Sequence, residues 1–167
     1  MKINRLLLIV GLMTVVVIAL LLATAVFAPQ NDPAQNAAIT FVNAAASGDD
    51  TSALSHLITP ELQAYIAENC PDGQVSRCIE SYTPDEWGAL QTAVFRRAAP
   101  SGAQARDVEL IATYASGTGA SGVCIYNRVE QGEDGQWRVA GWAGFIHCGD
   151  PASRNMATNP DTPNRAP

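Results

Sequence analysis

Basic residues are scarce in this chain of 167 residues. It contains 16 Asp and Glu against 10 Lys and Arg, and no Lys or Arg occurs between Arg5 and Arg77. The part that follows Ala28 carries all 16 acidic residues and only eight arginines, which leaves it with a net charge of −8. Phosphate groups are bound by clustered Lys and Arg. The charge balance therefore argues against nucleic acid and anionic lipid headgroups as partners.

Motifs of the common catalytic and metal-binding classes are also lacking. The sequence has no Gly-x-Ser-x-Gly elbow, no His-Glu-x-x-His motif and no Cys-x-x-Cys pair. Residues 117–122, G-T-G-A-S-G, match the dinucleotide fingerprint G-x-G-x-x-G letter for letter. That fingerprint must open a helix, whereas the residues that follow, V-C-I-Y-N-R-V, predict a strand. We therefore expect no cofactor and no metal ion.

Charges are absent altogether from residues 6–28. A helix needs about 20 apolar residues to span a bilayer, so this segment predicts a transmembrane anchor. Because Lys2 and Arg5 precede it, the positive-inside rule places the N-terminus in the cytoplasm. A cleaved signal peptide is the alternative, since residues 23–25, A-T-A, fit a cleavage pattern. Both interpretations export the domain, and the first makes the chain a single-pass cell-membrane protein with an extracytoplasmic C-terminal domain.

Four cysteines in an exported domain predict two disulfides. Cys70 and Cys78 bracket a short loop and are close enough in sequence to close it. Cys124 and Cys148 would be the second pair, but the hairpin register described below keeps them roughly 13 Å apart along the strand. A disulfide requires Cα atoms within about 7 Å. Either the last strand bends or bulges after Phe145, or the cysteines of the helical region bridge to the sheet instead.

The first half of the exported part carries helix signals. Asp32-Pro33 supplies an N-cap and a proline at the first helical position, and Thr83 opens a capping box. Apolar residues follow at helical spacing in each case. The loop 70–78 is expected to lead into an extended piece over 75–80. The predicted helices are 33–47, 51–58, 60–68 and 84–98.

From Asp107 onward the apolar residues alternate with a period of two, which predicts strands over 107–114, 123–129 and 137–147. Glu133-Asp134-Gly135 fits a three-residue hairpin loop, and Gly117-Thr118 fits a type II′ turn. The first turn pairs Glu130 with Arg138, Val129 with Val139, Tyr126 with Trp142, and Val123 with Phe145. The second pairs Leu110 with Ile125, Ala112 with Val123, Val108 with Asn127, and Asp107 with Arg128.

Helices followed by a meandering antiparallel sheet predict an α+β fold in which the helices cover the apolar sheet face. The helix A-I-T-F-V-N-A-A-A-S-G-D, the following L-x-x-x-I-T-P-E-L and the final E-D-G-Q-W-R-V-A-G-W resemble nuclear transport factor 2-like domains over residues 34–148. The resemblance implies a curved sheet wrapped round a helix, forming a cone with a pocket at its open end. That family includes isomerases, dehydratases, hydrolases, transport adaptors and exported domains without known activity, so the activity stays open. Outside the domain we expect a linker at 29–33 and a disordered tail at 149–167.

Few polar side chains are predicted to point into such a cone. On the strands they are Asn127, Tyr114 and His147, with no carboxylate among them, and Tyr65 is a candidate from the helices. These four are the predicted ligand-binding residues, and Asn127 should lie between Val108 and Gly141, where its amide either orients a ligand or bonds a nearby backbone group or water.

The outer sheet face carries the candidate partner surface, which consists of Tyr126, Trp142 and Ile146. The favoured interpretation is a membrane-anchored exported domain that binds a protein partner or a small apolar ligand without catalysis. One alternative is an exported isomerase- or hydrolase-type enzyme that uses Tyr65, His147 or a helix carboxylate. Another is a structural homodimer packed through the outer face.

Overall fold

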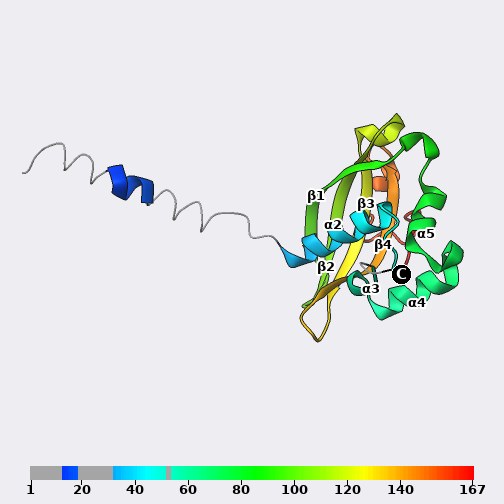
Figure 1. The fold of residues 1–167 in the computed structure, drawn as a ribbon, viewed down its shortest axis with the longest axis horizontal. Coiled ribbons are helices and arrows are strands. Elements are labelled where there is room, and N and C mark those ends of the chain that lie inside the picture. The colour runs from blue at the N-terminus through cyan, green and yellow to red at the C-terminus, as the bar shows by residue number, and fades with distance from the viewer. Residues whose placement is uncertain (1–12, 19–31, 52–53) are drawn as a thin grey trace, which may run out of the picture. The chain divides into compact units, whose positions relative to one another are not determined.

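The computed structural model describes residues 13–18, 32–51 and 54–167 (Figure 1). Residues 13–18 are helical and exposed, and Asp32–Pro167 form a compact unit of their own. No helix within the described ranges is long and apolar enough to cross a membrane. The predicted anchor at 6–28 lies outside the described residues, apart from 13–18, and so does most of the predicted linker at 29–33.

Helices form the first half of the compact unit. Asp32 caps the first by accepting a hydrogen bond from the Ala34 amide at 2.9 Å, and Thr59 caps another through the Leu62 amide. In both, proline occupies the first turn, where its missing N–H leaves no bond unmade. The elements are α2 (Pro33–Ala46), α3 (Leu54–Leu57), α4 (Pro60–Asn69), η1 (Pro71–Gly73), α5 (Val75–Tyr82) and η2 (Asp85–Trp87).

A four-stranded antiparallel sheet forms the second half. Its strands follow one another in the order β1-β2-β3-β4, as a meander. The bounds are β1 (Leu90–Pro100), β2 (Ala105–Tyr114), β3 (Val123–Gln131) and β4 (Trp137–His147). Helix α2 lies across the sheet and buries Phe41 and Val42 against the face that carries Val108, Ile125 and Val139 (Figure 1). The predicted α+β architecture is confirmed.

Two segments differ from their predicted structure. Residues 84–98, predicted as a helix, form η2 and then most of β1. Gly88 has φ 66° and ψ −155°, a conformation open to glycine alone, and it ends the helical turn. From there Leu90 pairs with Tyr114 and the strand continues along β2, so tertiary pairing overrides the local helix signal. Residues 75–80, expected to be extended, lie in α5 instead.

The register between β2 and β3 is confirmed at every predicted pair, from Asp107 with Arg128 to Ala112 with Val123. The turn that joins them differs, because a 3₁₀ helix, η3 (Gly117–Ser121), replaces the two-residue turn. The Trp87 ring packs on Gly119 so closely that an added Cβ would lie 2.7 Å from it. Trp87 also donates to the Thr118 hydroxyl at 3.0 Å, which fixes this connection.

The register between β3 and β4 is confirmed for Glu130 with Arg138 and for Val129 with Val139, and is wrong beyond them. One extra residue of β4, Ala140, shifts the pairing by one, and a second, Phe145, shifts it again. Each bulge inserts a residue that has no counterpart on β3. The remaining pairs are Arg128 with Gly141, Asn127 with Trp142, Tyr126 with Ala143, Ile125 with Gly144, Cys124 with Ile146, and Val123 with His147.

The same bulges bring the sheet cysteines together. Cys124 now lies opposite Ile146, two residues from Cys148, and the two cysteines form a disulfide with Cα atoms 5.0 Å apart. Cys70 and Cys78 form the other, also at 5.0 Å. Of the alternatives left open by the sequence, the bulged strand is the one observed, although the bulges lie within β4 and not after Phe145. Two disulfides are typical of proteins in an oxidising compartment.

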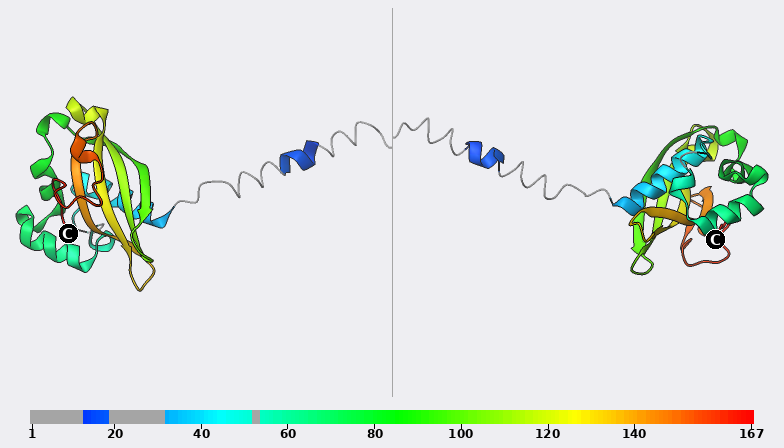
Figure 2. Two further views of the ribbon diagram at one scale, coloured as in Figure 1. Left: turned by 180° about the vertical axis from the view of Figure 1, so that it is seen from behind. Right: turned by 60° about the horizontal axis from the view of Figure 1, so that its bottom comes forward.

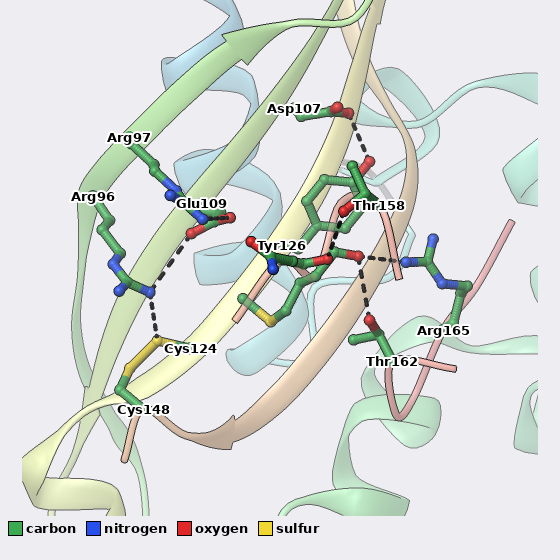
Figure 3. A network of polar contacts seen from close by, with 12 residues as sticks. Arg96, Arg97, Asp107, Glu109, Cys124, Tyr126, Cys148, Thr158, Thr162 and Arg165 are labelled. Carbon is green, nitrogen blue, oxygen red and sulfur yellow. Dashed lines mark hydrogen bonds and ion pairs between the residues drawn. A yellow bond between two sulfur atoms is a disulfide. The ribbon is translucent and has the colours of Figure 1, made fainter. Parts of the chain in front are cut away.

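The C-terminal strap, defined here as residues 149–167, is ordered where the sequence predicts disorder. Met156 is fully buried against Cys124, Tyr126 and Ala143, on the sheet face opposite α2. Arg165 lies over the Tyr126 ring at 5.8 Å and donates to the Met156 carbonyl. Figure 3 labels Arg165 and Tyr126 in this region. Ala166 is also buried, so the predominantly polar strap carries two buried apolar side chains. Figure 2 shows the strap, in red, beside β4 and the helices.

Candidate functional site

A cleft of about 550 Å³ opens between the end of α2, helix α5 and the start of β1. Three segments that are distant in sequence meet there, and η2 closes one side. Such a volume falls within the range of roughly 300–1,000 Å³ that small-molecule sites occupy. The lining residues are Ala45, Ala46, Ser47, Gly48, Gln74, Ser76, Arg77, Ile79, Glu80, Thr83, Pro84, Asp85, Gly88, Ala89, Leu90 and Tyr114.

The floor of the cleft is largely apolar. Tyr114, the last residue of β2, is buried and packs against the Trp87 ring with centroids 5.4 Å apart. Ile79 reaches the floor from the buried face of α5, and Leu90 reaches it from β1. Burial raises the pKa of the Tyr114 phenol above its ordinary value, while a hydrogen bond with the Thr83 side chain opposes this shift. The Tyr114 hydroxyl is therefore engaged with Thr83, which also lines the cleft.

The rim of the cleft is polar and carries more negative than positive charge. Arg77 and Glu80 form an ion pair at 2.7 Å on the exposed side of α5, and this hydrogen bond raises the pKa of Arg77. Asp85 adds a second carboxylate from η2. Since the one arginine is already paired with Glu80, the rim as a whole favours a neutral or cationic group over an anion.

Asp50 holds the two helices that flank the cleft. Its carboxylate accepts a hydrogen bond from the Ser76 amide at 3.1 Å and another from the Ser76 hydroxyl, at the start of α5. Asp50 follows the turn that ends α2, where the Asp49 amide bonds to the Ala44 carbonyl at 3.0 Å. A carboxylate at a helix N-terminus satisfies unpaired N–H groups. This contact therefore links the segment after α2 to the start of α5, beside the cleft.

Of the four predicted ligand-binding residues, only Tyr114 lines the cleft. Tyr65 packs half-buried against the core from α4. His147 is half-exposed near the end of β4 and bonds to the Ser121 hydroxyl at 2.8 Å and the Gly149 amide at 3.1 Å. Asn127 lies deep in the core. The structure thus does not bring these four side chains together.

Asn127 points inward, as the sequence predicts, but its neighbour differs. It is fully buried and faces Val108 on one side, as expected, and Trp142 on the other, in place of Gly141. Neither atom of its amide has a hydrogen-bond partner among the described residues. The bulge at Ala140 places an indole where the sequence predicts a residue without a side chain, so the space expected beside Asn127 is occupied.

The prediction of a partner surface at Tyr126, Trp142 and Ile146 is also wrong, because the bulge at Ala140 shifts the register of β4. Tyr126 and Trp142 lie on opposite faces of the sheet and are each 1 % exposed. Trp142 belongs to the inner core and lies 6.0 Å from the Phe41 ring. Tyr126 lies beneath the C-terminal strap, and Ile146 is half-buried. A one-residue shift moves each side chain of the shifted strand to the opposite face of the sheet, so Trp142 points into the inner core. The strap then covers Tyr126 on the outer face.

Sequence reasoning missed the residues of α5 that line the cleft. Val75 and Ile79 are four apart and are the buried positions of this helix, while Arg77 and Glu80 lie on its exposed side. That spacing is a helical signal, and it was present in the sequence. Many of the other lining residues, such as Ala45, Gly48 and Ala89, are small and carry no signal of their own, whereas Tyr114 was predicted from the period-two pattern of its strand. Among the described residues there is no group of three or more His, Cys, Asp or Glu side chains placed to hold a metal ion.

Comparison with protein-family models, with curated proteins and with solved structures gives no match for this chain.

Proposed function

We propose that this chain is an exported binding domain whose cleft takes a small ligand without transforming it. The volume of about 550 Å³ is the observation that carries the proposal, since it suits a small molecule. The apolar floor at Tyr114, Ile79 and Leu90, below a polar rim, supports a ligand with an apolar body and a neutral or cationic polar end. Both parts of such a ligand would find complementary groups in this cleft.

Export of the domain is part of the proposal. The two disulfides support an oxidising compartment. The membrane anchor at 6–28 rests on the sequence, namely on a charge-free segment of sufficient length preceded by two basic residues. We also keep the assignment to the nuclear transport factor 2-like architecture. Helices that precede a four-stranded meander and cover one of its faces support it.

Substitution of Ala89 tests the proposal. Ala89 is exposed and lines the cleft, so Ala89→Trp fills the entrance without disturbing the core. A small-molecule library is screened against the full chain by thermal shift, and each hit is titrated by calorimetry. We expect Ala89→Trp to weaken binding at least about tenfold, which corresponds to about 1.4 kcal/mol.

Ala103→Trp is the matched control, because Ala103 is equally exposed and lies in the loop after β1, outside the cleft. It should bind each hit as the wild-type chain does. Hits that bind both variants unchanged would place the ligand elsewhere and contradict the proposal. Conversion of a bound hit to a product, detected by mass spectrometry, would favour the isomerase- or hydrolase-type alternative.

A further inference from the structure

The disulfide between Cys124 and Cys148 joins a buried residue to an accessible one. Cys124 is 0 % exposed and packs against Met156 beneath the strap, whereas Cys148 is partly exposed just before the strap begins. A thiolate breaks a disulfide by attacking one of its two sulfur atoms, and it must reach that atom. Cys148 is therefore the residue open to attack, and the sulfur of Cys124 would be the leaving group.

An arginine contacts the buried sulfur. The Nη1 group of Arg96, on β1, donates a hydrogen bond to the Sγ atom of Cys124 at 3.3 Å (Figure 3). Sulfur in a neutral side chain is a weak acceptor, but a thiolate is stabilised by a neighbouring guanidinium. The contact should therefore strengthen when the S–S bond breaks, and Arg96 is already in place to hold a thiolate on Cys124.

The charges around this sulfur leave a net positive charge. Glu109 accepts from Arg97 at 2.7 Å through one carboxylate oxygen, and its other oxygen lies 3.6 Å from Arg96. Two guanidinium groups thus face one carboxylate, although the domain as a whole has a net charge of −8. Because Arg97 holds Glu109, Arg96 remains available to the sulfur. The local positive charge favours the approach of a thiolate as well as the formation of one on Cys124.

The second disulfide gives an internal comparison. Cys70 is 7 % exposed and Cys78 is partly exposed, so this disulfide also joins a buried residue to an accessible one. The Cα atoms are 5.0 Å apart in both disulfides. Within the described part of the chain, no arginine donates to Cys70 or Cys78, and the nearby Arg77 is paired with Glu80 at 2.7 Å. The hydrogen bond from an arginine thus distinguishes the disulfide of the sheet.

We propose that Cys148 is a site of reversible attachment of a small thiol by thiol–disulfide exchange. The thiolate attacks the Sγ atom of Cys148 and forms a mixed disulfide with it. The bond to Cys124 breaks in the same step, and its electron pair passes to the Cys124 sulfur, which becomes a thiolate held by Arg96. Attack by this thiolate on the mixed disulfide releases the thiol again, so no further reactant is needed.

The exposure of Cys148 favours a small thiol over one on a folded protein, because only part of the residue is accessible. Neither cysteine lines the cleft described above, and Arg96 does not line it either. The inference therefore does not depend on the proposed ligand site.

Limited exchange with reduced glutathione tests the proposal. The oxidised full-length chain is incubated with this thiol near neutral pH, and free cysteines are then trapped with N-ethylmaleimide under denaturing conditions. Peptide mapping by mass spectrometry locates both groups. We expect glutathione on Cys148 and the trapping group on Cys124, while the disulfide of Cys70 and Cys78 stays closed.

The Arg96→Gln variant tests the role of the guanidinium. Arg96 is exposed, and its loss should slow the formation of the Cys148 adduct at least about fivefold, because the leaving thiolate loses a charged hydrogen bond. Arg154→Gln is the matched control. It removes the same charge from an exposed position in the strap and should react as the wild-type chain does. If Arg96 only stabilised the fold, its loss would loosen the chain and speed the exchange, so the direction of the change separates the two roles.

The disulfide of Cys70 and Cys78 monitors the fold in the same samples, and its rate of opening should be equal in all three chains. A glutathione adduct on Cys124, or earlier opening of the disulfide of Cys70 and Cys78, would overturn the proposal. An adduct rate at Cys148 that Arg96→Gln leaves unchanged or raises would overturn it as well.

Discussion

Asn127 shows how far a single inserted residue changes a predicted site. The period-two pattern correctly places its side chain inward and opposite Val108. The position across β4 depends on Ala140, which the pattern treats as an ordinary strand residue and the structure makes a bulge. Alanine carries no sequence signal that predicts a bulge at this position. The direction of Asn127 was therefore predictable, whereas its neighbour Trp142 was not.

Because of Tyr126, the free energy of unfolding should change with pH in the alkaline range. Its hydroxyl donates to Asp107 at 2.7 Å, and burial, with this bond, raises the pKa of Tyr126 to about 12 from a usual value of 10.0. The folded state thus keeps a proton that the unfolded chain loses. This stabilisation is complete below pH 10 and is lost as the pH rises from 10 to about 12.

The Tyr126→Phe variant isolates this effect. It should be less stable than the wild-type chain below pH 10, since Asp107 loses a donor, and the difference should shrink by about 2–3 kcal/mol as the pH reaches about 12. Urea unfolding across this pH range measures it. Burial also raises the pKa of Tyr82 and Tyr114, but both remain in the variant and cancel in the comparison. A constant difference between the two chains would show that Tyr126 titrates normally.

At the scale of elements, the sequence predicts best where local and tertiary signals agree. Helices α2 and α4 combine proline starts, capping residues and an apolar stripe, and both appear as predicted. Residues 84–98 carry a capping box and a helical stripe, yet form β1, because Gly88 ends the turn and β2 offers a partner along its whole length. The sequence of a strand does not by itself determine which strand it pairs with.

The C-terminal strap is the element whose order is hardest to predict from its composition. Its Pro, Asn, Asp and Thr content predicts disorder, but hydrogen bonds to the sheet and one buried methionine order it. Met156→Ala should cost about 2–5 kcal/mol of unfolding free energy, because it opens a cavity over Tyr126 and Ala143. Met156→Leu nearly preserves the volume and should cost less than about 1.5 kcal/mol. Denaturant unfolding compares the two.

If the strap were disordered, the Met156 variants would give a different result. If residues 149–167 did not pack on the sheet, neither substitution would change the unfolding free energy. In that case the Arg165 guanidinium would also leave the Tyr126 ring, which it now overlies at 5.8 Å. Hydrogen exchange of the Ala166 amide, which bonds to the Trp142 carbonyl at 2.8 Å, provides an independent check. Protection of that amide requires the strap to be in place.

At the scale of the whole molecule, the sheet has a cover on each face. The helices bury the inner face, and the C-terminal strap buries the outer face of β3 and β4. The cleft belongs to the first of these layers, where α2, α5 and β1 meet. Its lining comes from segments that are separated in sequence and mostly carry small side chains. For that reason the location of the cleft could not be predicted from the sequence. The helical layer on the inner face could be predicted, whereas the strap that covers the outer face was expected to be disordered.

Each disulfide belongs to one of these layers, and the two should differ in their contribution to stability. Cys70–Cys78 closes a turn between α4 and α5, with a sequence separation of 8, whereas Cys124–Cys148 ties β3 to the start of the strap, with a separation of 24. Loop-closure entropy then predicts about 2.5 kcal/mol for the first and about 3.5 kcal/mol for the second. Cys124 is also fully buried, so its loss removes packing as well.

Paired alanine substitutions measure the two contributions separately. Cys124→Ala with Cys148→Ala should lower the urea midpoint more than Cys70→Ala with Cys78→Ala, and both pairs should steepen the slope, because the unfolded chain without its cross-link is more expanded. The first pair should also speed hydrogen exchange in the strap, because Cys148 no longer fixes its first residue, while the second pair should leave the strap unchanged. The reverse order of midpoints would mean that the helical layer, and not the covered outer face, depends more on its cross-link.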